Sequence, residues 1–183
     1  IDFLKNDKGF FIMIEGGQID WTSHSNDLSS AVGEIIDFND AVGVAIEFYK
    51  KHPEETLIIV TSDHETGGLS PSIDKGNIKV LDSQKKSYFL SEYECKSYFE
   101  RGLVFDSVFT KISKYFAFNS DITLSNNDTL RLINAYQAFM GKEFAEKKIL
   151  YTKYNPILIE ATAILCEKAG YYWKTTDHTG ENV

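Results

Sequence analysis

The sequence predicts an α/β fold that is part of a doubly wound sheet, with a helical insertion between two segments rich in polar side chains. Two continuous apolar runs, at residues 9–17 and 56–61, suit strands that are covered on both faces. A helical pattern separates them, and residues 70–172 contain no further run of that kind. We expect one domain (1–183) with an α/β part at 1–69, a mostly helical insertion or cap at 70–172 and a return segment at 173–183.

Composition narrows the class of protein. The chain has 183 residues, 43% of them apolar and 25% charged, as in an ordinary globular domain. Its net charge of -8 argues against nucleic acid or an anionic membrane as a partner, because both require a positive face. No apolar run reaches the roughly 18 to 20 residues of a membrane span. A site for anionic substrates would need metal cations.

The two ends and the two cysteines give further expectations. The opening IDFLKNDKG reads as the last turn of a helix already under way, and the chain stops shortly after DHTG, so we expect a piece of a longer protein. Cys95 and Cys166 lie far apart in the sequence and form either buried thiols, which we favour, or one disulfide.

The first part of the chain reads as strand, long helix, strand. The run GFFIMIEGG at 9–17 lies between glycines, and TLIIVT at 56–61 is similar. Between them a helical stripe ends near Pro53; it consists of Leu28, Val32, Ile35, Ile36, Val42, Ile46 and Tyr49. Such crossover units place the carboxyl ends of their strands at one edge of the sheet. We therefore expect the polar residues that follow the two strands to converge there: Glu15 with Asp20 and His24, and Asp63 with His64.

The region from 70 to 172 reads as helices. One apolar stripe consists of Phe105, Val108, Phe109, Ile112, Tyr115 and Phe116. Ser125 and Asp128 resemble a capping box that opens a helix closed by Gly141. A further helix is framed by Asn155, Pro156 and Gly170.

Four segments supply candidate metal ligands. They contain Glu15, Asp20 with His24, Asp63 with His64, and His178. Carboxylate oxygen and imidazole nitrogen suit zinc, and Asp20 and His24 are one helical turn apart, so both can face one ion. Glu15, which precedes two glycines, suits a harder ion such as magnesium. A lone His or Asp after a strand is more often a cap or turn residue, and His52 beside Pro53 keeps that interpretation.

Three segments closely resemble, in order and spacing, signature blocks of the alkaline phosphatase family. They are GFFIMIEGGQIDWTSHSND, TLIIVTSDHETGGL and AGYYWKTTDHTG. The resemblance implies that Asp20, His24 and His178 hold one zinc ion and that Asp63 and His64 hold a second. It implies that Glu15 is a magnesium ligand. Trp21 occupies a position that lies near the metal and phosphate site in the family, although an aromatic side chain there can equally serve packing.

The resemblance also implies chemistry that this chain does not complete. The family uses a serine nucleophile and a phosphoserine intermediate, and its nucleophile stands in an Asp-Ser-Ala block upstream of the first segment, which this chain lacks. Asp82-Ser83 and Asp106-Ser107 do not fit that block. Arg101 and Arg131 are not placed by any motif near the metals. We therefore expect no catalytic residue here and no activity from the 183 residues alone.

For the whole protein the resemblance implies hydrolysis of small-molecule phosphomonoesters, a homodimer, and a periplasmic or secreted location. Two alternatives stay open. One is another member of the same metal-dependent superfamily, such as a phosphodiesterase, a sulfatase or a cofactor-independent phosphoglycerate mutase. The other is a non-enzymatic metal-binding or interaction domain, whose aromatic helices would present a partner surface.

Overall fold

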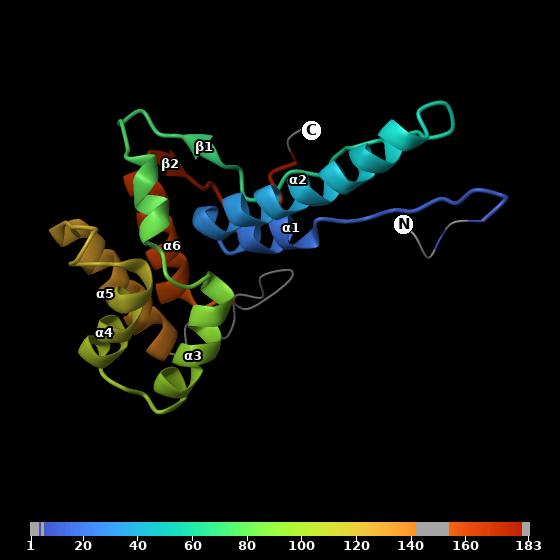
Figure 1. Ribbon diagram of the computed structural model, residues 1–183. Coiled ribbons are helices and arrows are strands. Elements are labelled where there is room, and N and C mark those ends of the chain that lie inside the picture. Colours follow the sequence, from blue (N-terminus) through green and yellow to red (C-terminus); the bar gives the residue numbers. More distant parts are fainter. Residues whose placement is uncertain (1–3, 5, 142–153, 181–183) are drawn as a thin grey trace.

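The computed structural model describes residue 4 and residues 6–141 and 154–180, which form mainly helices (Figure 1). The order is α1 (Gly17–His24), α2 (Leu28–Lys51), β1 (Ser70–Pro71), the 3₁₀ helix η2 (Ile78–Ser83), α3 (Tyr88–Glu100), α4 (Phe105–Phe116), α5 (Asn126–Met140), α6 (Pro156–Ala169) and β2 (Tyr171–Tyr172). Of the helix end predicted at residues 1–9, residues 1–3 and 5 lie outside this description.

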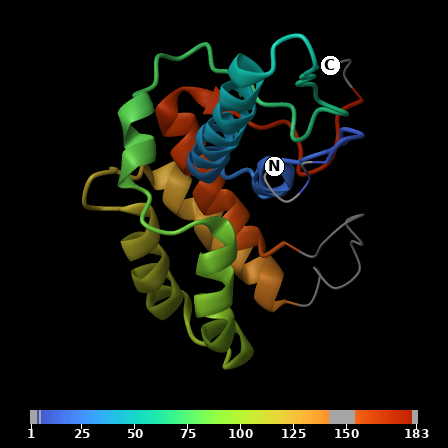
Figure 2. The ribbon, with the colours of Figure 1, turned by 45° about the vertical axis from the view of Figure 1, so that its right-hand side comes forward.

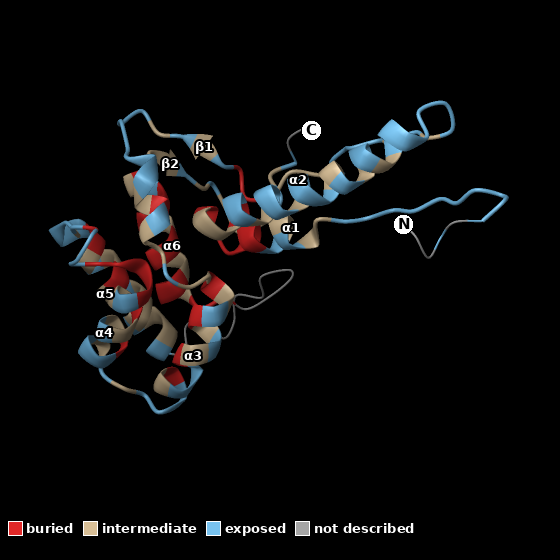
Figure 3. Ribbon diagram, viewed as in Figure 1, coloured by how far each residue is buried: buried red, intermediate tan, exposed pale blue. Residues whose placement is uncertain are grey.

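The long helix predicted after residue 27 is confirmed as α2. Asp27 begins it, because its side chain accepts a hydrogen bond from the Ser30 amide, and Lys50 and Lys51 stand in its last turn. The first turns of α2 pack against α1, and Leu28 and Ala31 are buried there. The rest of α2 extends away from the other helices, and most of its surface is exposed (Figure 3).

The two predicted strands at 9–17 and 56–61 are wrong for this structure. Neither segment belongs to a strand, and α1 begins at Gly17. Strands form only when neighbouring backbones supply hydrogen bonds along them, and no partner for either segment lies among the described residues. Their apolar side chains are correspondingly uncovered: Phe11 is 90% exposed and Leu57 is 83% exposed.

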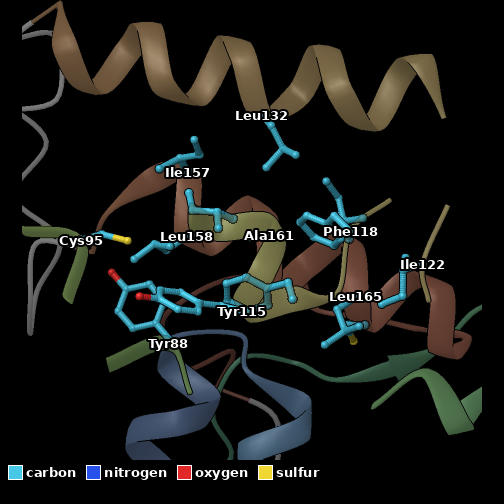
Figure 4. Close-up of a cluster of buried hydrophobic side chains, with 14 of the residues drawn as sticks. Tyr88, Cys95, Tyr115, Phe118, Ile122, Leu132, Ile157, Leu158, Ala161 and Leu165 are labelled. Carbon is cyan, nitrogen blue, oxygen red and sulfur yellow. The ribbon is translucent and has the colours of Figure 1, made fainter. Parts of the chain in front are cut away.

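The core lies in the helical group, which we define as η2 and α3 to α6. Val108, Ile112 and Phe116 of the predicted stripe in α4 are fully buried, and they belong to one cluster with Ile157 and Leu158 of α6. Figure 4 shows buried side chains of this cluster, Ile157 and Leu158 among them. α5 and α6 lie side by side in both views of the chain (Figure 2). No helix of the described residues combines the length and apolarity that a bilayer crossing requires.

The helix ends of this group follow the sequence. Ser125 and Asp128 form the predicted capping box of α5, since each side chain bonds to the backbone of the other residue. Pro156 stands in the first turn of α6, and Gly170 ends that helix in the left-handed conformation. Cys95 and Cys166 are buried free thiols, as favoured from the sequence.

The strands that the described residues form are two short antiparallel ones at the borders of the helical group. Ser70 pairs with Tyr172, and Pro71 pairs with Tyr171. A sheet of this size differs from the predicted doubly wound one. Its effect is to bring the chain that enters the helical group next to the chain that leaves it, close to α1.

Candidate metal centre

Helix α1 places the first two candidate ligands on one face. Asp20 and His24 are four residues apart, and His24 Nε2 lies 3.4 Å from Asp20 Oδ1. The helix stops directly after His24, because Asn26 adopts a left-handed conformation with φ of 54°. The one-turn spacing expected from the sequence is therefore realised by a helix of only eight residues.

His24 is held in one orientation by the return segment. Its side chain is buried, and Nδ1 lies 2.5 Å from the carbonyl oxygen of Thr176. Because a carbonyl only accepts, this hydrogen bond requires the hydrogen on Nδ1, and Nε2 is the ring nitrogen that faces Asp20. A backbone contact of this kind fixes the tautomer that metal-ligating histidines use.

The loop that contains His64 packs against the return segment through its glycines. The Gly67 amide donates to the Asp177 carbonyl over 3.0 Å, and the Gly67 carbonyl accepts from the Lys174 amide over 2.9 Å. Gly67 has φ of 84°, and a Cβ at this position would lie 2.5 Å from the ring of Trp173. Only glycine permits this approach, which brings His64 and His178 to the same place.

Three segments converge beside Asp20. His178 Nε2 lies 3.8 Å from Asp20 Oδ1, and the ring of His178 is 4.0 Å from that of His64 and 5.0 Å from that of His24, between centroids. Asp20, His64 and His178 each offer a ligand atom, and these atoms all lie within 4.8 Å of one another. The convergence expected from the sequence thus holds for these residues, although the extended segments before them are not strands.

The donor set fits a zinc ion. One carboxylate oxygen and two imidazole nitrogens are ligand types that zinc prefers. Ligands about 2.0 to 2.1 Å from a tetrahedral ion are roughly 3.3 Å apart. Within this set His178 Nε2 lies 3.8 Å from Asp20 Oδ1, and His24 Nε2, outside the set, lies 3.4 Å from the same oxygen. The sequence-based grouping placed His64 on a second ion, whereas the structure gathers it with Asp20 and His178.

Glu15, His24 and Asp63 lie outside this close group. Glu15 is exposed and approaches its own neighbour Gly17. The Asp63 side chain is 88% exposed, and its carboxylate lies 3.7 Å from His64 Nε2. Their assignment as metal ligands stays a prediction. Trp21 is 55% exposed, with its ring 6.1 Å from that of Phe89 in α3.

Two residues of the DHETGG run contribute to the site and were not identified from the sequence. The Thr66 hydroxyl donates to Asp20 Oδ1 over 2.5 Å and lies 3.2 Å from His64 Nδ1. The Glu65 carboxylate accepts hydrogen bonds from Gly68 and from Thr179. Burial alone would raise the pKa of Glu65, but these hydrogen bonds hold it below its usual value. The available signal was polar residues next to a ligand in a glycine-rich loop.

The rejected nucleophile candidates and the arginines lie in the helical group. Ser83 ends η2, and Ser107 lies in the first turn of α4. Arg131 of α5 is paired with Glu160 and Glu167 of α6. Arg101 is the C-cap residue of α3.

Comparison with known proteins agrees with these blocks. The family model described as alkaline phosphatase matches residues 1–183. Alkaline phosphatase 4 of Bacillus subtilis is 33% identical over 98% of this chain and 34% of its own length, and alkaline phosphatase 3 of the same organism is 50% identical over 39% of this chain and 15% of its own. The crystal structure of a cold-active alkaline phosphatase from a psychrophilic Shewanella species matches 96% of this chain and 38% of its own with a TM-score of 0.67, at 24% identity, which shows a shared fold. The chain spans about a third of the length of the relative that it matches throughout, and it belongs to the alkaline phosphatase family.

Proposed function

We propose that this chain supplies the metal-binding part of an alkaline phosphatase that hydrolyses phosphate monoesters with two zinc ions and one magnesium ion. The observation that carries the proposal is that Asp20, His64 and His178, which come from three segments far apart in sequence, have ligand atoms within 4.8 Å of one another. Carboxylate oxygen and imidazole nitrogen are ligand types of zinc, and catalytic zinc sites combine three protein ligands with one open position.

In this proposal Asp20, His24 and His178 hold one zinc ion, Asp63 and His64 hold the second, and Glu15 holds magnesium. Two zinc ions about 3.5 to 4 Å apart would bring His64 next to the ligands of the first ion, in keeping with the 4.0 Å between the rings of His64 and His178. When bound, the cations supply positive charge that attracts a phosphate group and stabilises its oxygens as they gain negative charge. The chain carries a net charge of -8, so phosphate binding depends on that positive charge.

The protein residues orient this site. The Thr176 carbonyl fixes the ring of His24, and the Thr66 hydroxyl holds one oxygen of Asp20. Both contacts tie a candidate ligand to a segment other than its own, so the ligands keep their relative positions without relying on a single loop.

The nucleophilic step belongs to the full-length protein. The 183 residues contain no Asp-Ser-Ala run, and Arg131 is engaged with two glutamates of α6. We propose that the nucleophile is a serine outside this chain, that a phosphoserine forms there, and that these residues alone do not hydrolyse aryl phosphates. We further propose that the full protein is a homodimer exported to the periplasm or beyond, with small-molecule phosphomonoesters as substrates.

Zinc binding tests the proposal directly. Metal-free protein is titrated with zinc against a chromophoric chelator, and bound zinc is counted after dialysis. We expect tight binding by the wild-type chain, at least about tenfold weaker binding by Asp20→Ala and His178→Ala, and no change in His52→Ala, which removes a histidine outside the site. Wild-type protein that binds no zinc, or a loss as large in His52→Ala, contradicts the assignment. Aryl phosphate hydrolysis by the purified chain at rates of a full-length relative contradicts the expected inactivity.

A further inference from the structure

We propose that Glu65 is a positioning residue that locks the loop of His178 onto the loop of His64 and thereby sets the geometry of the metal centre. This inference rests on the proposed function, since it names how that same site is held together. Glu65 does not itself belong to the group of ligand atoms within 4.8 Å of one another. Its role is to act through His178.

Both oxygens of the Glu65 carboxylate are engaged by main-chain donors of two different loops. Oε1 accepts from the amide of Gly68, in the same loop as His64. Oε2 accepts from the amide of Thr179, over 3.0 Å, and from the hydroxyl of Thr179. A carboxylate suits three donors because it only accepts, whereas an amide would turn an NH2 group toward at least one of them.

The contact lies immediately beside two candidate ligands. His64 precedes Glu65 in the chain, and His178 precedes Thr179. A bond between Glu65 and Thr179 therefore joins the backbones that carry the two imidazoles, whose ring centroids are 4.0 Å apart.

Backbone hydrogen bonds also join the loop of His64 to the residues that precede His178. The Gly67 amide donates to Asp177, and the Gly67 carbonyl accepts from the amides of Lys174 and Thr175. These bonds hold the segment before His178, and Glu65 holds the residue after it. His178 is thus fixed between two attachments to one loop, which limits the backbone freedom that would otherwise blur its position.

The test compares variants that remove this attachment in different ways. Glu65→Gln keeps the size of the side chain and removes part of its accepting capacity. Thr179→Val removes the hydroxyl and keeps the backbone amide, whereas Thr179→Ser keeps both. Glu47→Gln, which removes the same charge from an exposed pair with Lys50 on α2, is the matched control.

For zinc, we expect dissociation constants about 10 to 100 times larger in Glu65→Gln, a smaller increase in Thr179→Val, and wild-type values in Thr179→Ser and Glu47→Gln. Because Glu65 acts through His178, the loss caused by Glu65→Gln should vanish when His178 is already replaced by alanine. Wild-type affinity in Glu65→Gln, or an equal loss in the His178→Ala background, overturns the proposal. If Glu65→Gln does not fold, Thr179→Val carries the same comparison.

A measurement without metal separates this inference from the proposed function. In metal-free protein we expect slow hydrogen exchange at the Gly68 and Thr179 amides, and faster exchange at both in Glu65→Gln but not in Glu47→Gln. Unchanged exchange overturns the role of Glu65 whatever the metal does. If the wild-type chain binds no zinc but the exchange of these amides changes as expected, the metal assignment is wrong. The attachment of Glu65 to the loop of His178 is then confirmed.

Discussion

Asp27 is a fully buried carboxylate whose two oxygens join three elements. It accepts from the amide and hydroxyl of Ser30 in α2, from the Gln84 side chain over 2.9 Å and from the Tyr88 amide over 2.7 Å. Asp27→Ala should lower the free energy of unfolding by about 3 kcal/mol, because it leaves several buried donors without an acceptor. Urea denaturation checks this, with the exposed Asp40→Ala as a control that should change stability by less than about 0.5 kcal/mol. Equal unfolding curves for both variants would show that the donors find other partners.

Thr66 leads to a prediction about the site itself. Its hydroxyl holds Asp20 at 2.5 Å, so Thr66→Val, which keeps the shape and removes the hydrogen bond, should weaken zinc binding about tenfold. Thr66→Ser should restore most of the affinity. The measurement is zinc competition with a chelator, and Thr110→Val, at an exposed position of α4, is the control. A loss of equal size in the valine and serine variants would assign the effect to packing.

For single residues, the sequence indicated the candidate ligands but not the side chains that hold them in place by hydrogen bonds. Asp20 and His24 were predictable because helical spacing alone places them together. Glu65 and Thr66 were not, because their partners, Thr179 and Asp20, lie in other segments, and no local rule connects residues that distant.

The contact between α5 and α6 depends on a carboxylate whose ionisation makes stability depend on pH. Asp128 is 6% exposed and accepts from Lys168 Nζ over 2.8 Å. Burial alone would raise the pKa of Asp128, but the hydrogen bonds from Lys168 and Ser125 hold it below its usual value. The carboxylate is therefore favoured in the folded state. Its contribution is fully present above about pH 4 and is lost as the pH falls through the lower, folded-state pKa.

Replacing this carboxylate should reduce the dependence of the free energy of unfolding on pH in the acid range. Asp128→Asn should cost about 2 kcal/mol at pH 7 and much less at pH 2. Urea denaturation at both values measures this. Glu100→Gln, which alters an exposed pair with Lys96, should leave the pH dependence as it is. A parallel loss for Asp128→Asn at both pH values would mean that shape, rather than charge, matters at this position.

At the scale of elements, helices were predictable and strands were not. A helix satisfies its own backbone and its caps are local, so Ser125, Pro156 and Gly170 marked ends that the structure confirms. A strand depends on a neighbour that composition does not reveal. The runs at 9–17 and 56–61 have the apolar character of buried strands, yet in this structure Phe11 and Leu57 face solvent.

For the whole molecule, we expect local stability to differ between segments of the chain. The helical group contains most of the buried apolar residues, whereas segments 10–14 and 57–60 are extended and largely exposed. Limited chymotrypsin digestion should therefore cut the described residues first near Phe11 and Leu57, at least about tenfold faster than in α4 or α6. Peptide mapping by mass spectrometry checks this, with a digest in denaturant as the control. First cuts within α6 would be incompatible with this distribution of packing.

The two thiols report the opening of the helical group. Burial raises the pKa of Cys95 to about 11 and that of Cys166 to about 12, and both side chains have no measurable exposure. A thiol-specific disulfide reagent at pH 8 should therefore react with the native protein at least about a hundredfold more slowly than with the denatured one. Fast reaction of two thiols in the native state would show that this core opens readily.

Because Ser70 pairs with Tyr172, the chain enters and leaves the helical group at the same place, so this group behaves as an insertion. Length changes inside the insertion are absorbed within it and leave the spacing of His64 and His178 unaltered. One residue added between Tyr172 and His178 would instead displace the imidazole by about 3.3 Å, the rise of an extended residue. Insertions and deletions are therefore tolerated on one side of this junction and damaging on the other.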